Sequence, residues 1–239
     1  MDKTNFVVKL ADKNIEIQAL FNTTQIFLMD YLSEDTADFS VKISPSDLIY
    51  ERKKSENSNK YSDHYIETLA VYRKIADRII DHNIMLFHGS CVAVDGVAYL
   101  FTAKSGTGKS THTRLWCEYF QENAVMINDD KPLIHVGEND VIVYGTPWNG
   151  KHKLSSNIGA PLKGICILER DTSNHIKRVN PKEAYPILLQ QIHRPADARR
   201  LKKTLEILDK LIERVHIYKL GCTISMEAMK IAYNAMKGK

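Results

Sequence analysis

The sequence predicts a mixed α/β fold with a small β-rich appendage at its N-terminus. Apolar runs in the middle of the chain are separated by turn signals, which is typical of β-hairpins. One of these runs leads through a glycine-rich turn into a stretch with helical spacing, and the last third of the chain carries further stretches of that spacing. We therefore expect an appendage over residues 1–60 and a main α/β domain with a mixed sheet over residues 61–239.

The composition excludes several classes of protein. The 239 residues are 44% apolar and 26% charged, which is not expected of a disordered, collagen-like or coiled-coil chain. The net charge of +4 is too small to predict a dedicated nucleic-acid binder. No apolar run approaches the roughly 18 residues of a membrane span, and the N-terminus does not resemble a signal peptide. The four cysteines lack metal-ligand spacing, so we expect reduced thiols in a cytoplasmic protein without a membrane partner.

The N-terminal elements follow from local pattern. Alternating apolar and polar residues predict strands within Asn5–Leu20 and Asp38–Ile43. The most polar stretch, Glu51–Ser62, predicts a loop between the two parts. After it, apolar residues recur at intervals of three and four, so Asp63–His82 is predicted to be an amphipathic helix.

The middle of the chain carries two hairpin signals. Asp95-Gly96 separates the apolar runs Ile84–Val94 and Val97–Thr102, and an Asp-Gly pair favours a tight hairpin turn. The second signal is a polar Gly-Glu-Asn-Asp turn between two shorter apolar runs. The other elements predicted here are a helix over Lys109–Phe120 and strands over Ala124–Ile127, Pro132–Val136, Val141–Tyr144 and Lys163–Leu168.

The last third is predicted to be mostly helical. Asn180, Pro181 and Glu183 form a helix start, with a cap, a proline at the first helical position and a glutamate three residues past the cap. Pro186 is expected to weaken or bend this helix early. The remaining elements are an amphipathic helix marked by Leu201, Leu205, Leu208, Leu211, Ile212 and Val215, a strand over His216–Leu220 and a helix over Met226–Met236.

The strongest chemical signal is the segment Tyr99–Ser110, which fits a phosphate-binding loop between a strand and a helix. Gly106 and Gly108 allow the backbone to turn tightly and to aim N–H groups at phosphate oxygens. Lys109 can reach the β- and γ-phosphates of a nucleoside triphosphate, and the Ser110 hydroxyl can ligate Mg²⁺. The predicted nucleotide-binding residues are Ser105, Gly106, Thr107, Gly108, Lys109, Ser110 and Thr111, with Ala103 where the consensus begins with glycine.

Two acids follow the predicted strand Ala124–Ile127. Asp129 and Asp130 come at the end of a strand beside the phosphate-binding loop, where a Mg²⁺-binding carboxylate is needed. One acid can hold the metal while the other accepts a proton from an attacking hydroxyl. A solvated Asp-Asp turn is the alternative interpretation.

Two weaker signals lie nearby. His88 stands in an apolar run, where a histidine is either a hydrogen-bonded core residue or a catalytic group. The loop Tyr144–Lys153 carries Trp148, Lys151 and His152, which could contact a phosphate or the acceptor substrate; an ordinary turn is the alternative. A basic cluster, Arg199, Arg200, Lys202 and Lys203, is interpreted as a solvated helix face.

Taken together, His88-Gly89, Ser105–Ser110 and Asp129-Asp130 resemble the catalytic domain of HPr kinase/phosphorylase over residues 88–164. The resemblance implies a phosphoenolpyruvate-carboxykinase-like P-loop fold, a requirement for ATP and Mg²⁺, and assembly into homo-oligomers. The implied reaction is transfer of the γ-phosphoryl group to a hydroxyl of a protein, a peptide or a small molecule. The family's acidic segment after the aspartates is replaced here by Gly145–Gly150, which leaves the acceptor and the reverse reaction open.

The resemblance also implies roles for single residues. His88, Lys109 and Asp130 would be catalytic, with Asp130 as the base, and Ser110 and Asp129 would hold Mg²⁺. Two alternatives remain at this point. One is a nucleotide-binding regulatory module that does not transfer phosphate, and the other is a carboxykinase-like lyase. Binding of nucleic acid through the basic helix is a third, weaker one.

Overall fold

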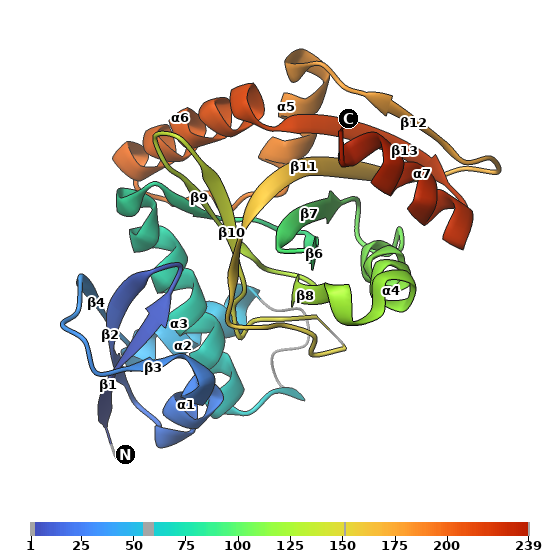
Figure 1. Ribbon diagram of the computed structural model, residues 1–239. Helices are drawn as coiled ribbons and strands as arrows, with labels where there is room; N and C mark the ends of the chain where they lie inside the picture. The colour runs from blue at the N-terminus through green and yellow to red at the C-terminus, as the bar shows by residue number, and fades with distance from the viewer. Residues whose placement is uncertain (1–2, 55–59, 151, 239) are drawn as a thin grey trace. The chain divides into compact units, whose positions relative to one another are not determined.

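The structure is a computed structural model that describes residues 3–54, 60–150 and 152–238 (Figure 1). It is a mixed α/β fold, as predicted. The chain divides into two compact units, residues 1–79 and residues 80–239. None of the helices in the described ranges combines the length and apolar character needed to cross a membrane.

Unit 1 contains a four-stranded sheet with the strand order β3-β1-β2-β4. The alternation seen in the sequence is confirmed, because β1 and β2 form an antiparallel hairpin whose turn residues, Ala11 and Asp12, have positive φ. Two short helices, α1 and η1, were not predicted. The elements are β1 (Thr4–Leu10), β2 (Lys13–Ala19), α1 (Asn22–Phe27), η1 (Met29–Tyr31), β3 (Leu32–Ser33), β4 (Phe39–Lys42), α2 (Pro45–Lys54) and α3 (Asp63–Ile79).

The helix α3 belongs to unit 1, so the predicted boundary at residue 60 is wrong. The carboxylate of Glu67 on α3 is fully buried and accepts hydrogen bonds from the backbone N–H groups of Leu20 and Phe21 and from the Thr24 hydroxyl. These bonds occupy donors at the start of α1. The predicted loop Glu51–Ser62 also begins too early, since α2 continues to Lys54 and Glu51 pairs with Arg73 of α3.

A partly buried carboxylate, that of Asp47, also ties α2 to α3. Lys74 Nζ lies 2.8 Å from its Oδ2, and Arg73 Nη2 lies 3.1 Å from its Oδ1. Although burial opposes ionisation, hydrogen bonds from Lys74 and Ser44 lower the pKa of Asp47 from 3.8 to about 2. A carboxyl whose pKa is lower in the folded state stabilises that state above its ordinary pKa, and the stabilisation is lost as the pH falls through the lowered value.

We expect Asp47→Asn to lower the free energy of unfolding of unit 1 by about 2 kcal/mol at pH 7. The difference from the wild-type protein should shrink as the pH falls from about 5 toward 2, because Asp47 itself becomes protonated. Urea unfolding, together with hydrogen exchange of the α3 amides, measures both effects. Asp63→Asn is the matched control: its exposed pair with Arg52 should contribute less than about 1 kcal/mol. An equal loss in both variants would contradict the role of Asp47.

Unit 2 is built on a larger sheet, which contains nine of the described strands. The main path is β5-β9-β10-β11-β7-β6-β8, and β13 joins β11 with β12 beside it. The strands are β5 (Ile84–Leu86), β6 (Ser90–Val94), β7 (Val97–Thr102), β8 (Ala124–Asn128), β9 (Leu133–Val136), β10 (Val141–Tyr144), β11 (Gly159–Arg170), β12 (His175–Arg178) and β13 (His216–Cys222). The helices are η3 (Ile80–His82), α4 (Lys109–Phe120), η4 (Gln121–Asn123), α5 (Pro181–Leu189), α6 (Ala198–Arg214) and α7 (Met226–Met236).

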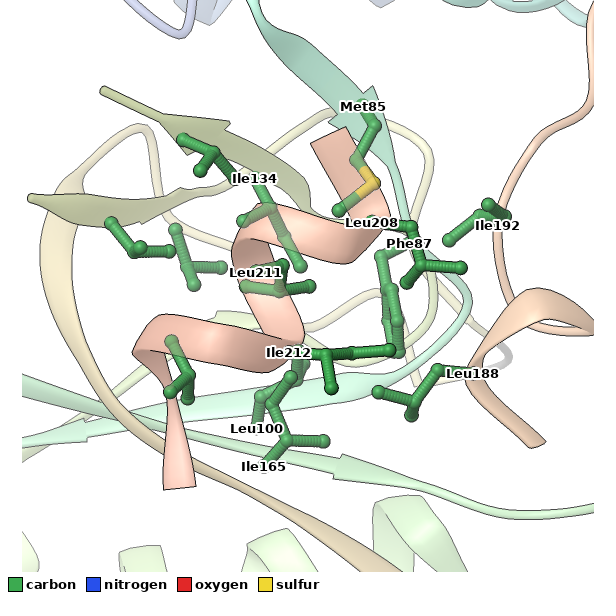
Figure 2. Packing of buried hydrophobic residues seen from close by; sticks show 14 of the residues in the cluster. Met85, Phe87, Leu100, Ile134, Ile165, Leu188, Ile192, Leu208, Leu211 and Ile212 are labelled. Carbon is green, nitrogen blue, oxygen red and sulfur yellow. The ribbon is translucent and has the colours of Figure 1, made fainter. Parts of the chain in front are cut away.

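The sheet of unit 2 is covered by helices on both faces. Leu100 of β7 belongs to a core cluster with α5 and α6, and Figure 2 shows Leu208 and Leu211 of α6 in this cluster. The neighbouring residue Phe101 belongs to a second cluster, which includes Trp116 of α4 and residues of α7. Because successive side chains of a strand point to opposite faces, a strand buried on both faces has a continuous apolar sequence.

One edge of this sheet gathers the segments that carry polar chemistry. β7, β11 and β13 are parallel to one another, so their carboxyl ends lie at the same edge. β6 runs antiparallel to both β7 and β8, so the carboxyl end of β8 and the start of β6 also lie at this edge. In sheets of this type ligands bind outside the carboxyl ends of the parallel strands.

The predicted strand Ile84–Val94 is interrupted in the structure at His88-Gly89. Its halves, β5 and β6, are separated by four strands in the sheet order, yet only residues 87–89 connect them. If the sheet were flat, the four intervening strands would hold β5 and β6 about 24 Å apart. A link of three residues spans at most about 14 Å. The sheet must therefore curl to bring β5 and β6 closer together. A Cβ at Gly89 would lie 2.9 Å from the carbonyl oxygen of Phe101, which explains the glycine at the crossing.

Two further differences are that β11 is longer than predicted and that β12 was not predicted.

Candidate functional site

The segment between β7 and α4, residues 103–108, forms the glycine loop of this site. Gly106 and Gly108 have φ of 78° and 119°, a region that disfavours side chains and explains both glycines. Gly108 precedes α4, whose first turn has no side-chain cap. The N–H groups of a first helical turn have no acceptor within the helix and carry partial positive charge, so the end of α4 is suited to an anion.

Lys109 begins α4 and folds back over the glycine loop. Its side chain is largely buried, and Nζ donates to the carbonyl oxygen of Ala103 at 3.2 Å. Burial lowers the pKa of Lys109, although the negative charge of Asp130 acts in the opposite direction. A cation is therefore held across the loop, and among the described residues the Ala103 carbonyl is its one hydrogen-bond partner.

A second cation, Arg170 at the end of β11, also contacts the glycine loop. Its Nη2 donates to the carbonyl oxygen of Gly106 at 2.6 Å, and its Nε lies 3.5 Å from the carbonyl oxygen of Thr107. Arg170 was not predicted, since it lies far from the loop in sequence. Of the other predicted nucleotide-binding residues, Ser105 is exposed and Thr111 is half-buried on α4.

Asp129, directly after β8, is a buried acid with one oxygen that has no partner among the residues the structure describes. The carboxylate accepts a hydrogen bond from the N–H of Gly150 through Oδ1, while Oδ2 has no hydrogen-bond partner in the described ranges. Burial raises the pKa of Asp129 despite this bond. The Ser110 hydroxyl lies beside it, 3.4 Å from the Asp129 carbonyl oxygen. These oxygens fit Mg²⁺, which commonly takes one or two protein ligands and completes its shell with phosphate oxygens and water. The described residues contain no group of three His, Cys, Asp or Glu side chains that would hold a metal alone.

Asp130 has partners for both carboxylate oxygens. His88 Nε2 lies 3.2 Å from Oδ1, and Lys131 Nζ lies 3.2 Å from Oδ2. Burial would raise the pKa of Asp130, but the hydrogen bond from His88 and the charge of Lys131 outweigh it and lower the pKa. His88 is half-exposed, so it is not a core histidine. The site therefore contains an ionised carboxylate, oriented by two donors, beside the glycine loop.

Asn128 fixes the turn that carries Asp130 and Lys131. The side chain is fully buried, and its Oδ1 accepts the N–H groups of Asp130 at 2.8 Å and Lys131 at 2.6 Å. Its Nδ2 donates to the carbonyl oxygen of Thr146 at 2.9 Å, with Trp148 O at 3.4 Å. One amide thus joins the turn after β8 to the loop after β10.

We expect Asn128→Ala to lower the free energy of unfolding of unit 2 by about 3 kcal/mol, since it leaves several buried backbone groups unpaired. Asn149→Ala is the matched control, because within the described ranges the side chain of Asn149 makes one hydrogen bond, to Ser155 Oγ at 2.8 Å. Urea unfolding of the two variants measures the difference. A loss no larger for Asn128→Ala than for Asn149→Ala would contradict this role.

The residues predicted to bind the acceptor differ in their exposure to solvent. Trp148 is buried, at 7% exposed, and its carbonyl oxygen is hydrogen-bonded to Asn128, so it supports the loop and is not an open binding surface. His152 is exposed, and its charge lowers the pKa of Asp129, against the larger effect of burial. Lys151 lies outside the described residues.

The basic cluster on α6 is largely occupied by intramolecular contacts. Arg200 Nη2 lies 3.0 Å from the carboxylate of Asp81, and Lys203 Nζ donates to the Asp81 carbonyl oxygen. Lys202 pairs with Glu206 along the helix. This pattern agrees with a structural role for the cluster.

Sequence reasoning missed several residues of the site. Lys131 follows the predicted aspartates directly, and its charge was a usable signal. The carbonyl oxygen of Gln191 accepts the N–H of His88 at 2.6 Å, and its side-chain Oε1 is buried without a hydrogen-bond partner among the residues that the structure describes. No motif marks Gln191 or Arg170, because only the folded sheet brings them to the site.

No known family model matches this chain, and no curated protein does. Among solved structures, the chain is similar to the HPr(Ser) kinase/phosphatase from Coxiella burnetii. The two share 11% identity at a TM-score of 0.35, and the match covers 64% of this chain and 99% of that chain. A TM-score this low carries no argument, so the function has to be inferred from the residues of this chain.

Proposed function

We propose that this protein is an ATP- and Mg²⁺-dependent kinase that transfers the γ-phosphoryl group to a hydroxyl. The observation that carries the proposal is the arrangement at one sheet edge. Asp130, oriented by His88, lies within electrostatic reach of Lys109, which begins the helix behind the glycine loop. We further propose that unit 2 is a P-loop core of the phosphoenolpyruvate-carboxykinase-like type.

The glycine loop would bind the phosphates of the nucleotide. The N–H groups of the loop and of the first turn of α4 would donate to phosphate oxygens, and Lys109 would exchange its bond to Ala103 O for one to the β- or γ-phosphate. Ser110 and Asp129 would hold Mg²⁺, which when bound neutralises charge on the β- and γ-phosphate oxygens. The buried Asp129 Oδ2, which has no partner within the described part of the chain, supports this assignment.

The transfer step follows from the position of Asp130. The acceptor hydroxyl would donate a hydrogen bond to the Asp130 carboxylate, and its oxygen would attack the γ-phosphorus in line with the bridging oxygen of the leaving group. A bond forms between the hydroxyl oxygen and phosphorus, the bond from phosphorus to the β-phosphate oxygen breaks, and the hydroxyl proton passes to Asp130. Because phosphoryl transfer has a loose transition state, positioning and electrostatics supply most of the catalysis.

The acceptor would approach past His88, whose side chain is 40% exposed. We propose a hydroxyl of a protein, a peptide or a small molecule. The regulatory and lyase alternatives have no observation of their own in their favour.

The test is a transfer assay with γ-labelled ATP and Mg²⁺ on the full chain. The acceptor source is a cell extract separated into protein and small-molecule fractions. We expect label in one fraction, which then states the class of acceptor. Tight ATP binding with no transfer to either fraction would overturn the kinase proposal in favour of a nucleotide-dependent regulator.

A further inference from the structure

The segment that follows α5 pairs with the link that carries His88. Phe87 on the link and Ile192 form an antiparallel bridge. Beside this bridge, the N–H of His88 donates to the carbonyl oxygen of Gln191 at 2.6 Å. In antiparallel pairing the next residue on one segment faces the preceding residue on the other, so Gln191 lies directly opposite His88.

This register decides which way the Gln191 side chain points. Phe87 and Ile192 both belong to the core cluster beneath α5 and α6 (Figure 2). Because successive side chains of an extended segment point to opposite faces, His88 and Gln191 share the face that points away from this core. The His88 ring meets the carboxylate of Asp130 on that face. Gln191 therefore lies beside the proposed catalytic pair.

The other edge of the same link is held by the turn that carries Asp130. The N–H of Gly89 donates to the Asp130 carbonyl oxygen at 3.0 Å, and the N–H of Phe87 donates to the Pro132 carbonyl oxygen at 3.1 Å. The link thus runs between two segments, with Asp130 on one side and Gln191 on the other. A substrate that reaches Asp130 past the half-exposed His88 lies next to Gln191 as well.

Gln191 carries a hydrogen-bond acceptor that the described residues leave unsatisfied. Its Oε1 is buried, and no donor within the described ranges reaches it. A buried acceptor without a donor is unfavourable, so in native proteins such a group usually has a bound partner. Gln191 as a whole is only partly buried, and the last torsion of a glutamine side chain is broad. A small rotation of the amide therefore brings Oε1 to the surface of the site.

The chemistry of this oxygen limits what can bind to it. An amide oxygen only accepts hydrogen bonds, so its partner must be a donor. The ionised phosphates of a nucleotide offer acceptors alone. The reacting hydroxyl has a single proton, which passes to Asp130 in the proposed transfer step. The partner of Gln191 must therefore be a second donor on the acceptor substrate.

We propose that Gln191 determines acceptor specificity, with Oε1 accepting a hydrogen bond from an N–H or O–H group beside the reacting hydroxyl. This inference rests on the proposed function and narrows the acceptor from any alcohol to one that carries a nearby amine, amide or second hydroxyl. A simple alcohol leaves Oε1 unpaired, and a site built to bind a donor rejects an analogue that lacks it.

The first experiment replaces Gln191 by methionine, which has a similar length but no amide. The acceptor is the extract fraction that takes label from γ-labelled ATP, supplied as a dilution series. We expect Gln191→Met to raise the apparent KM for this fraction at least about tenfold, because the second donor loses its partner. The KM for ATP should stay within about twofold, and kcat at saturating acceptor within about threefold. The matched control is Gln190→Met, at the exposed neighbouring glutamine, which should change none of the three.

Urea unfolding of the same variants without substrate separates recognition from a structural role. Gln191→Met removes a buried acceptor that lacks a donor, so the unfolding midpoint should stay the same or rise. A lower midpoint with an unchanged KM for the acceptor would show that Oε1 is already satisfied in the free protein. That result would overturn the proposal.

The second experiment identifies the kind of donor. Ethanol, ethanolamine and ethylene glycol are offered to the wild-type protein as acceptors at equal concentration. Ethanolamine or ethylene glycol should accept label at least about tenfold faster than ethanol, and Gln191→Met should remove this preference. Preference for ethanolamine indicates an N–H donor, and preference for ethylene glycol indicates an O–H donor. Equal transfer to all three would overturn the proposal. If none of the three accepts label, the KM for the extract fraction decides.

The outcomes distinguish this inference from the proposed function. Transfer by the wild-type protein that Gln191→Met leaves unchanged, in KM as in rate, would overturn the role of Gln191 while the kinase proposal stands. Absence of transfer by the wild-type protein to every fraction would overturn the kinase proposal, and this inference with it.

Discussion

Replacing Asp130 by asparagine is expected to slow phosphoryl transfer by about 10³-fold, within the range for loss of a general base. Asparagine keeps an oxygen that can accept the hydrogen bond from His88 Nε2, so the local geometry should persist. It can no longer take the proton of the acceptor hydroxyl. ATP affinity should stay the same or rise slightly, because a negative charge near the phosphates is removed.

Single-turnover transfer of label from γ-labelled ATP measures the rate, and calorimetric titration measures the affinity. Asp140→Asn, at an exposed aspartate of unit 2, is the control for loss of a carboxylate. If Asp130→Asn keeps full function while substitution of Lys109 abolishes it, the protein is a nucleotide-dependent regulator.

Replacing Lys109 by methionine is expected to weaken ATP binding by at least about 100-fold and to abolish transfer, because a buried cation that faces phosphate is lost. Methionine keeps much of the apolar stem of lysine. Although the substitution should weaken ATP binding, it should not lower the free energy of unfolding. Burial lowers the pKa of Lys109, so the charged form destabilises the folded state, and the opposing charge of Asp130 does not cancel this effect. The free energy of unfolding at pH 7 should therefore stay the same or increase.

Urea unfolding without nucleotide, followed by titration with ATP, tests both halves of this expectation. Lys104→Met, at the exposed lysine of the same loop, should leave affinity within about threefold. A Lys109→Met protein that binds ATP normally would exclude the phosphate-binding role of the glycine loop.

The elements predicted best are those whose signals are local. The hairpin of β6 and β7 was marked by Asp95-Gly96, and α7 was predicted with its observed ends. The interruption at His88-Gly89 was missed, because all of Ile84–Leu86 and Ser90–Val94 is buried and the sequence reads as one apolar run. The domain boundary was misplaced for a related reason. Periodicity shows that α3 has an apolar face but not which sheet covers that face.

In the candidate site too, residues marked by a local sequence motif were predicted, and residues that act through contacts distant in sequence were missed. Gly106, Gly108 and Lys109 belong to one continuous motif, and the structure places the glycines between β7 and α4 and Lys109 at the start of α4, as expected. Asn128 and Arg170 act through bonds to backbone groups far away in the chain, so residue type alone did not reveal them. Trp148 was assigned to substrate contact from its type, but its burial makes it part of the scaffold.

The short link between β5 and β6 has a consequence for the order in which the protein becomes active. The glycine loop lies between consecutive elements, so contacts close in sequence suffice to form it, and such contacts form early in folding. The pair of His88 and Asp130 instead requires the whole curled sheet, because His88 lies on the link that the curl brings together. An incompletely folded chain could therefore form the glycine loop without the pair of His88 and Asp130. If the protein is the kinase proposed above, transfer would require this last long-range strand pairing, so transfer would report complete folding more strictly than nucleotide binding would.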